Sequence, residues 1–354
     1  MSALTATDPL CLLEQMQADL AGQPELYRPT EFWRAASARI AAELRADGFE
    51  NFRRLETARS FFVPSYGPPG NMLTAAEVAQ IEALMLATAP RGSKKHATLL
   101  ELLSGRAWAL SDYRVFLAGD RPEIAPDLSG ISESAEGNPP DVFEVDGRRF
   151  SRSMLNYLHG LVFIKQVLGE TAIRTVLEIG GGFGTLGEIL HKTGGNYAYV
   201  DVDIPPTSAV ASYYLGQIPG LDLVNYEETR GQGPIPVPGA GRQLVICPWQ
   251  LPQLTGVVDL VWNYISFQEM EPDVVRFYLE QGRRLGARYV LLRNLREGKQ
   301  QRSAQSPLGV AQPILGGDYD AFLPGYRLAA TNVLPFGYRT VDGFHSELRL
   351  YVRA

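Results

Sequence analysis

A glycine-rich turn lies between a predicted strand and a predicted helix near the middle of the chain. Residues 175–179 form an apolar β-type run, Gly180, Gly182 and Gly184 follow at alternate positions, and residues 186–191 have a helix-like pattern. Glycines let the backbone turn sharply and let a ligand approach it closely. The stretch therefore predicts the first strand–turn–helix unit of an α/β sheet, with a ligand site at the turn.

Glu178, on the strand just before the turn, indicates which ligand is expected. Residues 182–187 also fit Gly-x-Gly-x-x-Gly, which in a nicotinamide or flavin site places a pyrophosphate on the helix N-terminus. A carboxylate at Glu178 repels a pyrophosphate and suits an ammonium group. S-adenosylmethionine carries an amino-acid head and a sulfonium but no phosphate, so we expect this cofactor. The alternatives are a nucleotide site and a glycine turn without a ligand.

The composition excludes several classes of function. The chain has 354 residues, of which 45% are hydrophobic, and a net charge of −6. This length suggests one large or two modest domains, and the charge argues against general binding to nucleic acid or anionic membranes. Cys11 and Cys247 are the only cysteines, which supports no disulfide framework or cysteine-based zinc site. No signal peptide or membrane-spanning run is recognised, so we expect a cytoplasmic protein.

Two regions with different patterns divide the chain. Residues 1–150 are expected to be mostly helical, with helices at 10–20, 30–44, 74–86, 99–110 and 113–117 and a polar connection at 119–150. Residues 151–168 form an amphipathic helix, and alternating strands and helices follow. We expect residues 1–150 to cap the substrate, to form a homodimer, or both, and residues 151–354 to bind the cofactor.

The second region predicts a seven-stranded, doubly wound, Rossmann-like sheet. The strands are expected at residues 175–179, 197–202, 243–246, 257–262, 289–292, 328–333 and 348–352. If the seventh strand is antiparallel, the loop 334–346 lies at the carboxyl edge of the sheet, where ligands bind. Residues 296–319 are expected to form a substrate loop or lid.

Further cofactor-binding candidates lie at the ends of these strands. Asp201 and Asp203 end the second strand, where a carboxylate can accept from both ribose hydroxyls, and Asp203 is preferred because Pro205 and Pro206 mark the strand's end. The remaining candidates are Trp249 and Gln250 for the adenine, Arg152 and Tyr157 for the methionine carboxylate, and Asn263 after the fourth strand.

These motifs resemble those of class I S-adenosylmethionine-dependent methyltransferases. The resemblance rests on Glu-x-Gly-x-Gly-x-Gly from Glu178, on the Asp203 position and on the seven-strand count, and it covers residues 150 to 354. Three stretches, 177–182, 199–206 and 266–270, resemble the sugar O-methyltransferase family. The resemblance implies transfer of a methyl group to a sugar hydroxyl. The helical N-terminal region is not covered by it.

Methylation of a hydroxyl needs a base that removes its proton. His345 on the predicted catalytic edge, Glu269 after the fourth strand and His159 near the cofactor are the candidates. No metal is expected to be required, because Glu271 and Asp273 flank Pro272 and are placed to open a helix, where acids favour the macrodipole.

We therefore expect an enzyme that methylates a hydroxyl of a sugar or polyol-like small metabolite by in-line displacement. One alternative is N-methylation of an amino sugar or small amine. Another is a catalytically silent subunit that keeps the cofactor fold. A nucleobase N-methyltransferase is disfavoured, because residues 263–266 (Asn-Tyr-Ile-Ser) lack the Pro-Pro-aromatic that follows the strand-four Asn in such enzymes.

Overall fold

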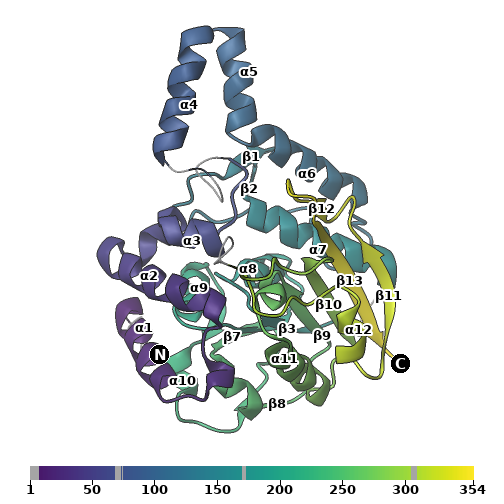
Figure 1. The fold of residues 1–354 in the computed structure, drawn as a ribbon. Helices are drawn as coiled ribbons and strands as arrows, with labels where there is room; N and C mark the ends of the chain where they lie inside the picture. Colours follow the sequence, from purple (N-terminus) through teal and green to yellow (C-terminus); the bar gives the residue numbers. More distant parts are fainter. Residues whose placement is uncertain (1–7, 68–72, 74, 170–172, 304–308) are drawn as a thin grey trace.

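The computed structural model describes residues 8–67, 73, 75–169, 173–303 and 309–354 (Figure 1). The predicted helix start at Thr74, part of the predicted loop at 64–70 and the middle of the predicted lid, 304–308, lie outside the described residues. The helices and strands below are those of the described part of the chain.

One large sheet forms the centre of the molecule. Its main strands are β3 (Thr175–Ile179), β4 (Ala198–Val202), β7 (Arg242–Ile246), β9 (Leu260–Tyr264), β10 (Tyr289–Leu295), β11 (Tyr326–Asn332) and β13 (His345–Arg353). They lie in the order β11-β13-β10-β9-β3-β4-β7, and β13 is antiparallel to both of its neighbours. The carboxyl ends of the parallel strands β3, β4, β7, β9 and β10 therefore meet at one edge of the sheet, beside the loop between β11 and β13.

A strand lies at each of the seven places predicted from the sequence. The described sheet has two more, β5 (Asp222–Val224) beside β7 and β12 (Tyr338–Arg339) beside β13, so it contains nine strands instead of seven. The fourth strand begins at Leu260, later than the predicted residue 257, because Val257 is 66% exposed and follows Gly256 at φ 116°.

Helices cover both faces of the sheet, which explains why its parallel strands β3, β4 and β9 are mostly apolar and fully or almost fully buried. Successive residues of a strand point to opposite faces, and Val176 and Leu177 accordingly belong to two different hydrophobic clusters. The covering helices are α7 (Arg152–Leu168), α8 (Thr185–Lys192) and α9 (Thr207–Gln217) on the Val176 side, and α11 (Pro272–Arg284) and α12 (Asp318–Phe322) on the Leu177 side.

The first 150 residues are mostly helical in the described part. They contain α1 (Pro9–Ala21), α2 (Glu31–Asp47), α3 (Glu56–Phe61), α4 (Ala75–Thr88), α5 (Lys94–Leu103), α6 (Arg106–Gly119) and the hairpin strands β1 (Phe143–Val145) and β2 (Arg148–Phe150). The predicted helix 99–110 is divided at Gly105, whose φ of 78° interrupts the helix. Leu13 and Met16 of α1 share one hydrophobic cluster with α7 and the sheet. The division at residue 150 therefore stays a prediction.

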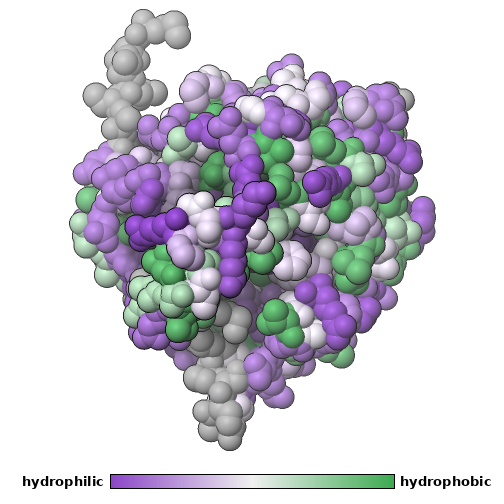
Figure 2. Space-filling model, turned by 90° about the horizontal axis from the view of Figure 1, so that it is seen from above, coloured by the Kyte–Doolittle hydropathy of each residue, from purple (hydrophilic) through white to green (hydrophobic). Residues whose placement is uncertain are grey.

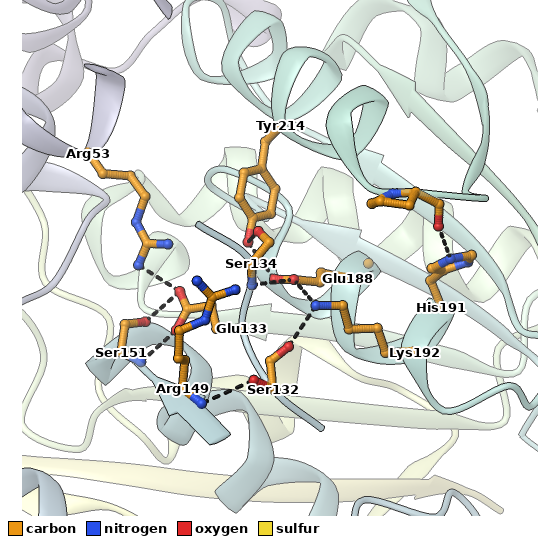
Figure 3. Close-up of polar contacts among 12 residues, drawn as sticks. Arg53, Ser132, Glu133, Ser134, Arg149, Ser151, Glu188, His191, Lys192 and Tyr214 are labelled. Atoms are coloured by element: carbon orange, nitrogen blue, oxygen red, sulfur yellow. Dashed lines mark hydrogen bonds and ion pairs between the residues drawn. The ribbon is translucent and has the colours of Figure 1, made fainter. Parts of the chain in front are cut away.

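A buried ionic network fixes the N-terminal region against the sheet region (Figure 3). Arg53 Nη2 lies 2.6 Å from Glu133 Oε1, and both side chains are about 1% exposed or less. Glu133 also accepts hydrogen bonds from the backbone and hydroxyl of Ser151, the N-cap of α7. Next to it, Glu188 of α8 accepts from the Tyr214 hydroxyl. The network holds the start of α7 and the start of α8, which flank the glycine turn.

The α4–α5 pair projects away from the body of the molecule (Figure 1). Seen from that side, hydrophobic and hydrophilic residues are interspersed on the surface (Figure 2). Leu84 of α4 and Trp108 of α6 are 72% and 65% exposed. The expected homodimer stays a prediction. Among the described helices, none combines the length and the apolar character that crossing a bilayer requires.

Candidate functional site

A cavity of about 140 Å³ opens at the carboxyl edge of β3, β4 and β9. Its floor is formed by the glycine turn 179–183 and residues 202–204 after β4, and one wall by the segment 264–270 after β9. The opposite wall comes from the N-terminal region, through Arg28, Pro29, Thr30, Trp33, Phe61, Phe62 and Pro64. Doubly wound sheets bind their ligands in pockets at this edge.

The glycine turn needs glycine for two separate reasons. Gly180, Gly182 and Gly184 have φ values of 72°, 65° and 91°, which strain any other residue. A Cβ on Gly180 would also lie 2.2 Å from the Ser266 hydroxyl. The backbone of the turn thus lies directly against the segment after β9, and it lines the cavity without side chains in the way.

Asp203 lies at the cavity and Asp201 lies beneath the turn. Asp203 Oδ2 accepts a hydrogen bond from the Gly182 N–H at 3.0 Å and Oδ1 accepts from the Ile204 N–H at 2.7 Å. Burial raises the pKa of Asp203 to about 7. Asp201 is fully buried, and a Cβ on Gly181 would lie 2.4 Å from its Oδ1. Of the two acids proposed for the ribose, only Asp203 borders the cavity.

Glu178 does not line the cavity, and this changes its expected role. Its carboxylate is fully buried and accepts hydrogen bonds from the hydroxyls of Tyr157 at 2.6 Å and Tyr199 at 2.5 Å. Burial raises the pKa of Glu178 to about 7, against the effect of the two tyrosines. The direct contact with an ammonium group expected from the sequence does not fit this position, and Glu178 instead holds Tyr157, which does line the cavity.

The other cofactor candidates lie apart from the cavity lining. Asn263 is fully buried and donates to the Ile179 carbonyl and the Ser266 hydroxyl, so it joins β9 to the glycine turn. The Gln250 side chain accepts a hydrogen bond from the Cys247 N–H and donates one to the Thr229 hydroxyl. Trp249 packs edge-on against Tyr226, with ring centres 6.1 Å apart.

Arg152 also lies outside the cavity lining. Its Nη1 donates to the Ser65 carbonyl, and its guanidinium lies over the rings of Tyr66 and Tyr338.

Glu269 is the one of the three proposed bases that borders the cavity. Its Oε2 accepts from the Trp33 indole at 3.0 Å, and its Oε1 lies 2.7 Å from Lys299 Nζ. Its backbone carbonyl accepts from the Thr30 hydroxyl, so Thr30 binds this segment instead of capping α2 with its side chain. Glu269 thus joins α2, the 299 loop and the cavity.

The two proposed histidines are placed elsewhere by the structure. His345 begins β13 at the expected edge, but its Nδ1 lies 2.7 Å from Glu297 Oε1 and 2.8 Å from Arg296 Nη2, which hold the ring outside the cavity lining. His159 is 3% exposed within α7, its Nε2 lies 2.9 Å from the Asp112 carbonyl, and burial lowers its pKa. Neither ring reaches the site as expected of a base.

Sequence reasoning missed Ser153, Asn156 and Thr185, which also line the cavity. Ser153, Asn156 and Tyr157 are spaced by three and four residues, which places them on one face of a helix. That polar spacing at the start of an otherwise apolar helix was the signal that could have identified them. Among the described residues, no group of three His, Cys, Asp or Glu side chains is arranged to hold a metal ion.

Comparison with known proteins gives limited similarity. No protein-family model matches the sequence. No curated protein matches it significantly.

Several solved methyltransferases align with the chain at low scores. The magnesium protoporphyrin IX methyltransferase of Synechocystis PCC 6803, with bound S-adenosylmethionine, is 12% identical over 60% of this chain and 86% of its own, with a TM-score of 0.36. A methyltransferase of Aquifex aeolicus is 14% identical over 57% of this chain and 94% of its own, with a TM-score of 0.37. A glycopeptide N-methyltransferase in complex with S-adenosylhomocysteine is 14% identical over 55% of this chain and 88% of its own, with a TM-score of 0.36. The fold assignment rests on the strand order, not on these scores.

Proposed function

We propose that the chain is an S-adenosylmethionine-dependent methyltransferase that acts on a hydroxyl of a sugar or glycosylated small metabolite. One observation carries the proposal: the glycine turn and Asp203 border one cavity at the carboxyl edge of a sheet with the order β11-β13-β10-β9-β3-β4-β7. This is the edge where a doubly wound sheet binds nucleosides.

The residues around the turn fit a nucleoside without phosphates. A pyrophosphate needs free backbone N–H groups at the turn, yet the Gly182 N–H already donates to Asp203. The three acids Glu178, Asp201 and Asp203 lie close together: the charge of Asp203 raises the pKa of Glu178, and the charges of Glu178 and Asp203 both raise the pKa of Asp201. This acidic environment opposes a dinucleotide and favours a cationic cofactor.

The chain's own residues supply binding and proton transfer. When bound, the cofactor supplies a methyl group already activated by its sulfonium. Asp203 borders the cavity, and we assign it to the ribose hydroxyls, while Trp33, Phe61 and Phe62 give the cavity an apolar wall. Glu269 also borders the cavity, and we assign to it the removal of the proton from the acceptor hydroxyl.

The alternatives stay distinguishable by experiment. Methylation of an amino sugar instead of the matching sugar would favour N-methylation. Cofactor binding without turnover on any acceptor would favour a catalytically silent subunit.

Methyl transfer from radiolabelled S-adenosylmethionine to a panel of free, acidic and amino sugars tests the proposal. We expect label on a sugar hydroxyl. Labelling of amines alone would overturn the hydroxyl assignment.

A further inference from the structure

Arg293, near the end of β10, is a buried cation that keeps one hydrogen-bond donor without a partner among the described residues. Its side chain is 1% exposed, and no salt bridge joins it to any residue that the structure describes. Its Nε donates to the Ser346 hydroxyl at 3.1 Å, while its Nη1 is buried without a hydrogen-bond partner. Burying a charge without a counter-charge is costly, so such groups are normally paired.

Aromatic rings, not carboxylates, surround this guanidinium. Its centre lies 5.4 Å from the Tyr264 ring and 5.1 Å from the Tyr338 ring. Arg152 approaches the same Tyr338 ring, at 5.4 Å. Cation–π contacts hold the two arginines in place but do not neutralise them. Both guanidinium groups thus approach the Tyr338 ring, one from α7 and one from β10.

One acid, Asp112, contacts the cluster through Tyr66 and not through an arginine. Asp112 accepts a hydrogen bond of 2.5 Å from the Tyr66 hydroxyl, and no ion pair with Arg152 or Arg293 is found among the described residues. Arg152 is also the first residue of α7, where the positive end of the helix dipole disfavours a cation. Both positions are therefore unfavourable for arginine unless an anion binds there.

The cluster adjoins the proposed active site. Tyr264, which Arg293 contacts, lines the cavity, and so does Ser153, the neighbour of Arg152 in sequence. The strand of Arg293 lies three strand positions from that of Asp203, roughly 14 Å across the sheet. The arginines thus lie at the side of the cavity away from the proposed ribose site. Arg152 and Tyr338 are half-buried, so the cluster is not wholly closed off from solvent.

We propose that Arg293 and Arg152 bind an oxyanion group of the acceptor, so that the substrate is an acidic sugar carrying a carboxylate or a phosphate. This inference rests on the proposed methyltransferase function. Arginine suits planar oxyanions, because its forked donors bind two oxygens at once. The unpartnered Nη1 of Arg293 is the donor that the anion completes. The anion then fixes which hydroxyl faces Glu269.

The test uses the full chain saturated with S-adenosylhomocysteine, and the probes are D-glucuronate, inorganic phosphate and neutral glucose at matched ionic strength. The variants are Arg293→Met, Arg152→Met and the control Arg174→Met. Arg174 also lies over a tyrosine ring, that of Tyr197, but at the amino end of β3. Calorimetry measures affinity for the cofactor product first and for each probe second.

We expect the wild type to bind glucuronate or phosphate more tightly than glucose, and Arg293→Met to weaken that binding about 10- to 100-fold. Arg152→Met, at a half-buried site, should weaken it less, and Arg174→Met should leave it unchanged. Affinity for S-adenosylhomocysteine should stay within about twofold in all three variants. The responding probe identifies the oxyanion as carboxylate or phosphate.

Three results would overturn the inference. The first is a wild type that binds neither anion better than glucose. The second is anion binding that Arg293→Met and Arg152→Met both retain. The third is loss of S-adenosylhomocysteine binding in Arg293→Met, which would assign the arginine to the cofactor's carboxylate and leave the methyltransferase proposal intact. A wild type that fails to bind S-adenosylhomocysteine at all is the separate failure of the proposed function.

Discussion

The Trp33 indole donates a hydrogen bond of 3.0 Å to Oε2 of Glu269, and this bond joins α2 to the segment that follows β9. Both residues line the cavity. The N-terminal region therefore does more than cover the sheet: one of its side chains orients the carboxylate proposed to act as the base.

Replacing Trp33 by Phe keeps an aromatic wall but removes the donor to Glu269. We expect a loss of about 1–2 kcal/mol in the free energy of unfolding, because a buried carboxylate oxygen loses a charge-assisted hydrogen bond. Urea denaturation measures it. The control Trp108→Phe, at a 65% exposed position, should change stability little. Equal effects of the two substitutions would show that the Trp33–Glu269 bond contributes nothing specific.

Glu269→Gln removes the proposed base while keeping the side-chain shape. We expect kcat for the acceptor found in the methyl-transfer screen to fall by ~10²–10⁴. Affinity for S-adenosylhomocysteine should be unchanged, because the cofactor site is formed by the glycine turn and Asp203. Glu271→Gln is the matched control, since the Glu271 side chain accepts a hydrogen bond from the Ala311 N–H and does not line the cavity. An active Glu269→Gln enzyme rules out Glu269 as the base.

The buried pair Arg53–Glu133 predicts a large stability effect. Glu133→Gln leaves Arg53 as an uncompensated buried charge, so we expect a loss of about 3–5 kcal/mol. Asp222→Asn removes one partner of the exposed pair Arg242–Asp222 and should cost ~0–1 kcal/mol. Urea denaturation measures the free energy of unfolding of both variants. Similar small effects in both variants would mean that the buried network does not hold the start of α7.

The acidic cluster predicts how stability changes with pH. The pKa of Glu178 is raised from 4.5 to about 7, so the folded state binds more protons than the unfolded state between these values. The contribution of Glu178 to stability should therefore fall by on the order of 3 kcal/mol as pH rises from about 4.5 to 7 and be constant above. Asp203, whose pKa is also raised to about 7, adds a fall of the same sign. Urea denaturation from pH 5 to 8 measures this fall.

Glu178→Gln should reduce the slope of stability against pH, and Glu280→Gln, at an exposed helix position, should leave it unchanged. Stability that rises with pH across this window would contradict the buried position of Glu178.

The parts of the fold that follow from local pattern could be predicted from the sequence. The run Thr175–Ile179 and the glycines after it are fixed by apolar composition and by positive φ, both of which are local properties. The family resemblance implied the number of strands but not the two short extra strands of the sheet. The extra edge strand Asp222–Val224 has only three residues, too few to give a periodic pattern.

The side-chain directions at the site could not be predicted. His345 lies at the expected edge, but its ring contacts Arg296 and Glu297. These two residues follow β10, whereas His345 begins β13. Glu178 was placed correctly in the chain, yet Tyr157 and Tyr199 occupy its oxygens. Both outcomes depend on contacts between residues more than twenty positions apart, which no local pattern contains.

The most direct measurement is calorimetric titration of the protein with S-adenosylhomocysteine, for the wild type, Asp203→Asn and the control Asp222→Asn. We expect the wild type and the control to bind S-adenosylhomocysteine with micromolar affinity. Asp203→Asn should bind it at least ~10-fold more weakly, because the Asn amide offers one acceptor oxygen to the ribose instead of two. A folded wild type that shows no binding would contradict the methyltransferase assignment and with it the acidic-sugar inference.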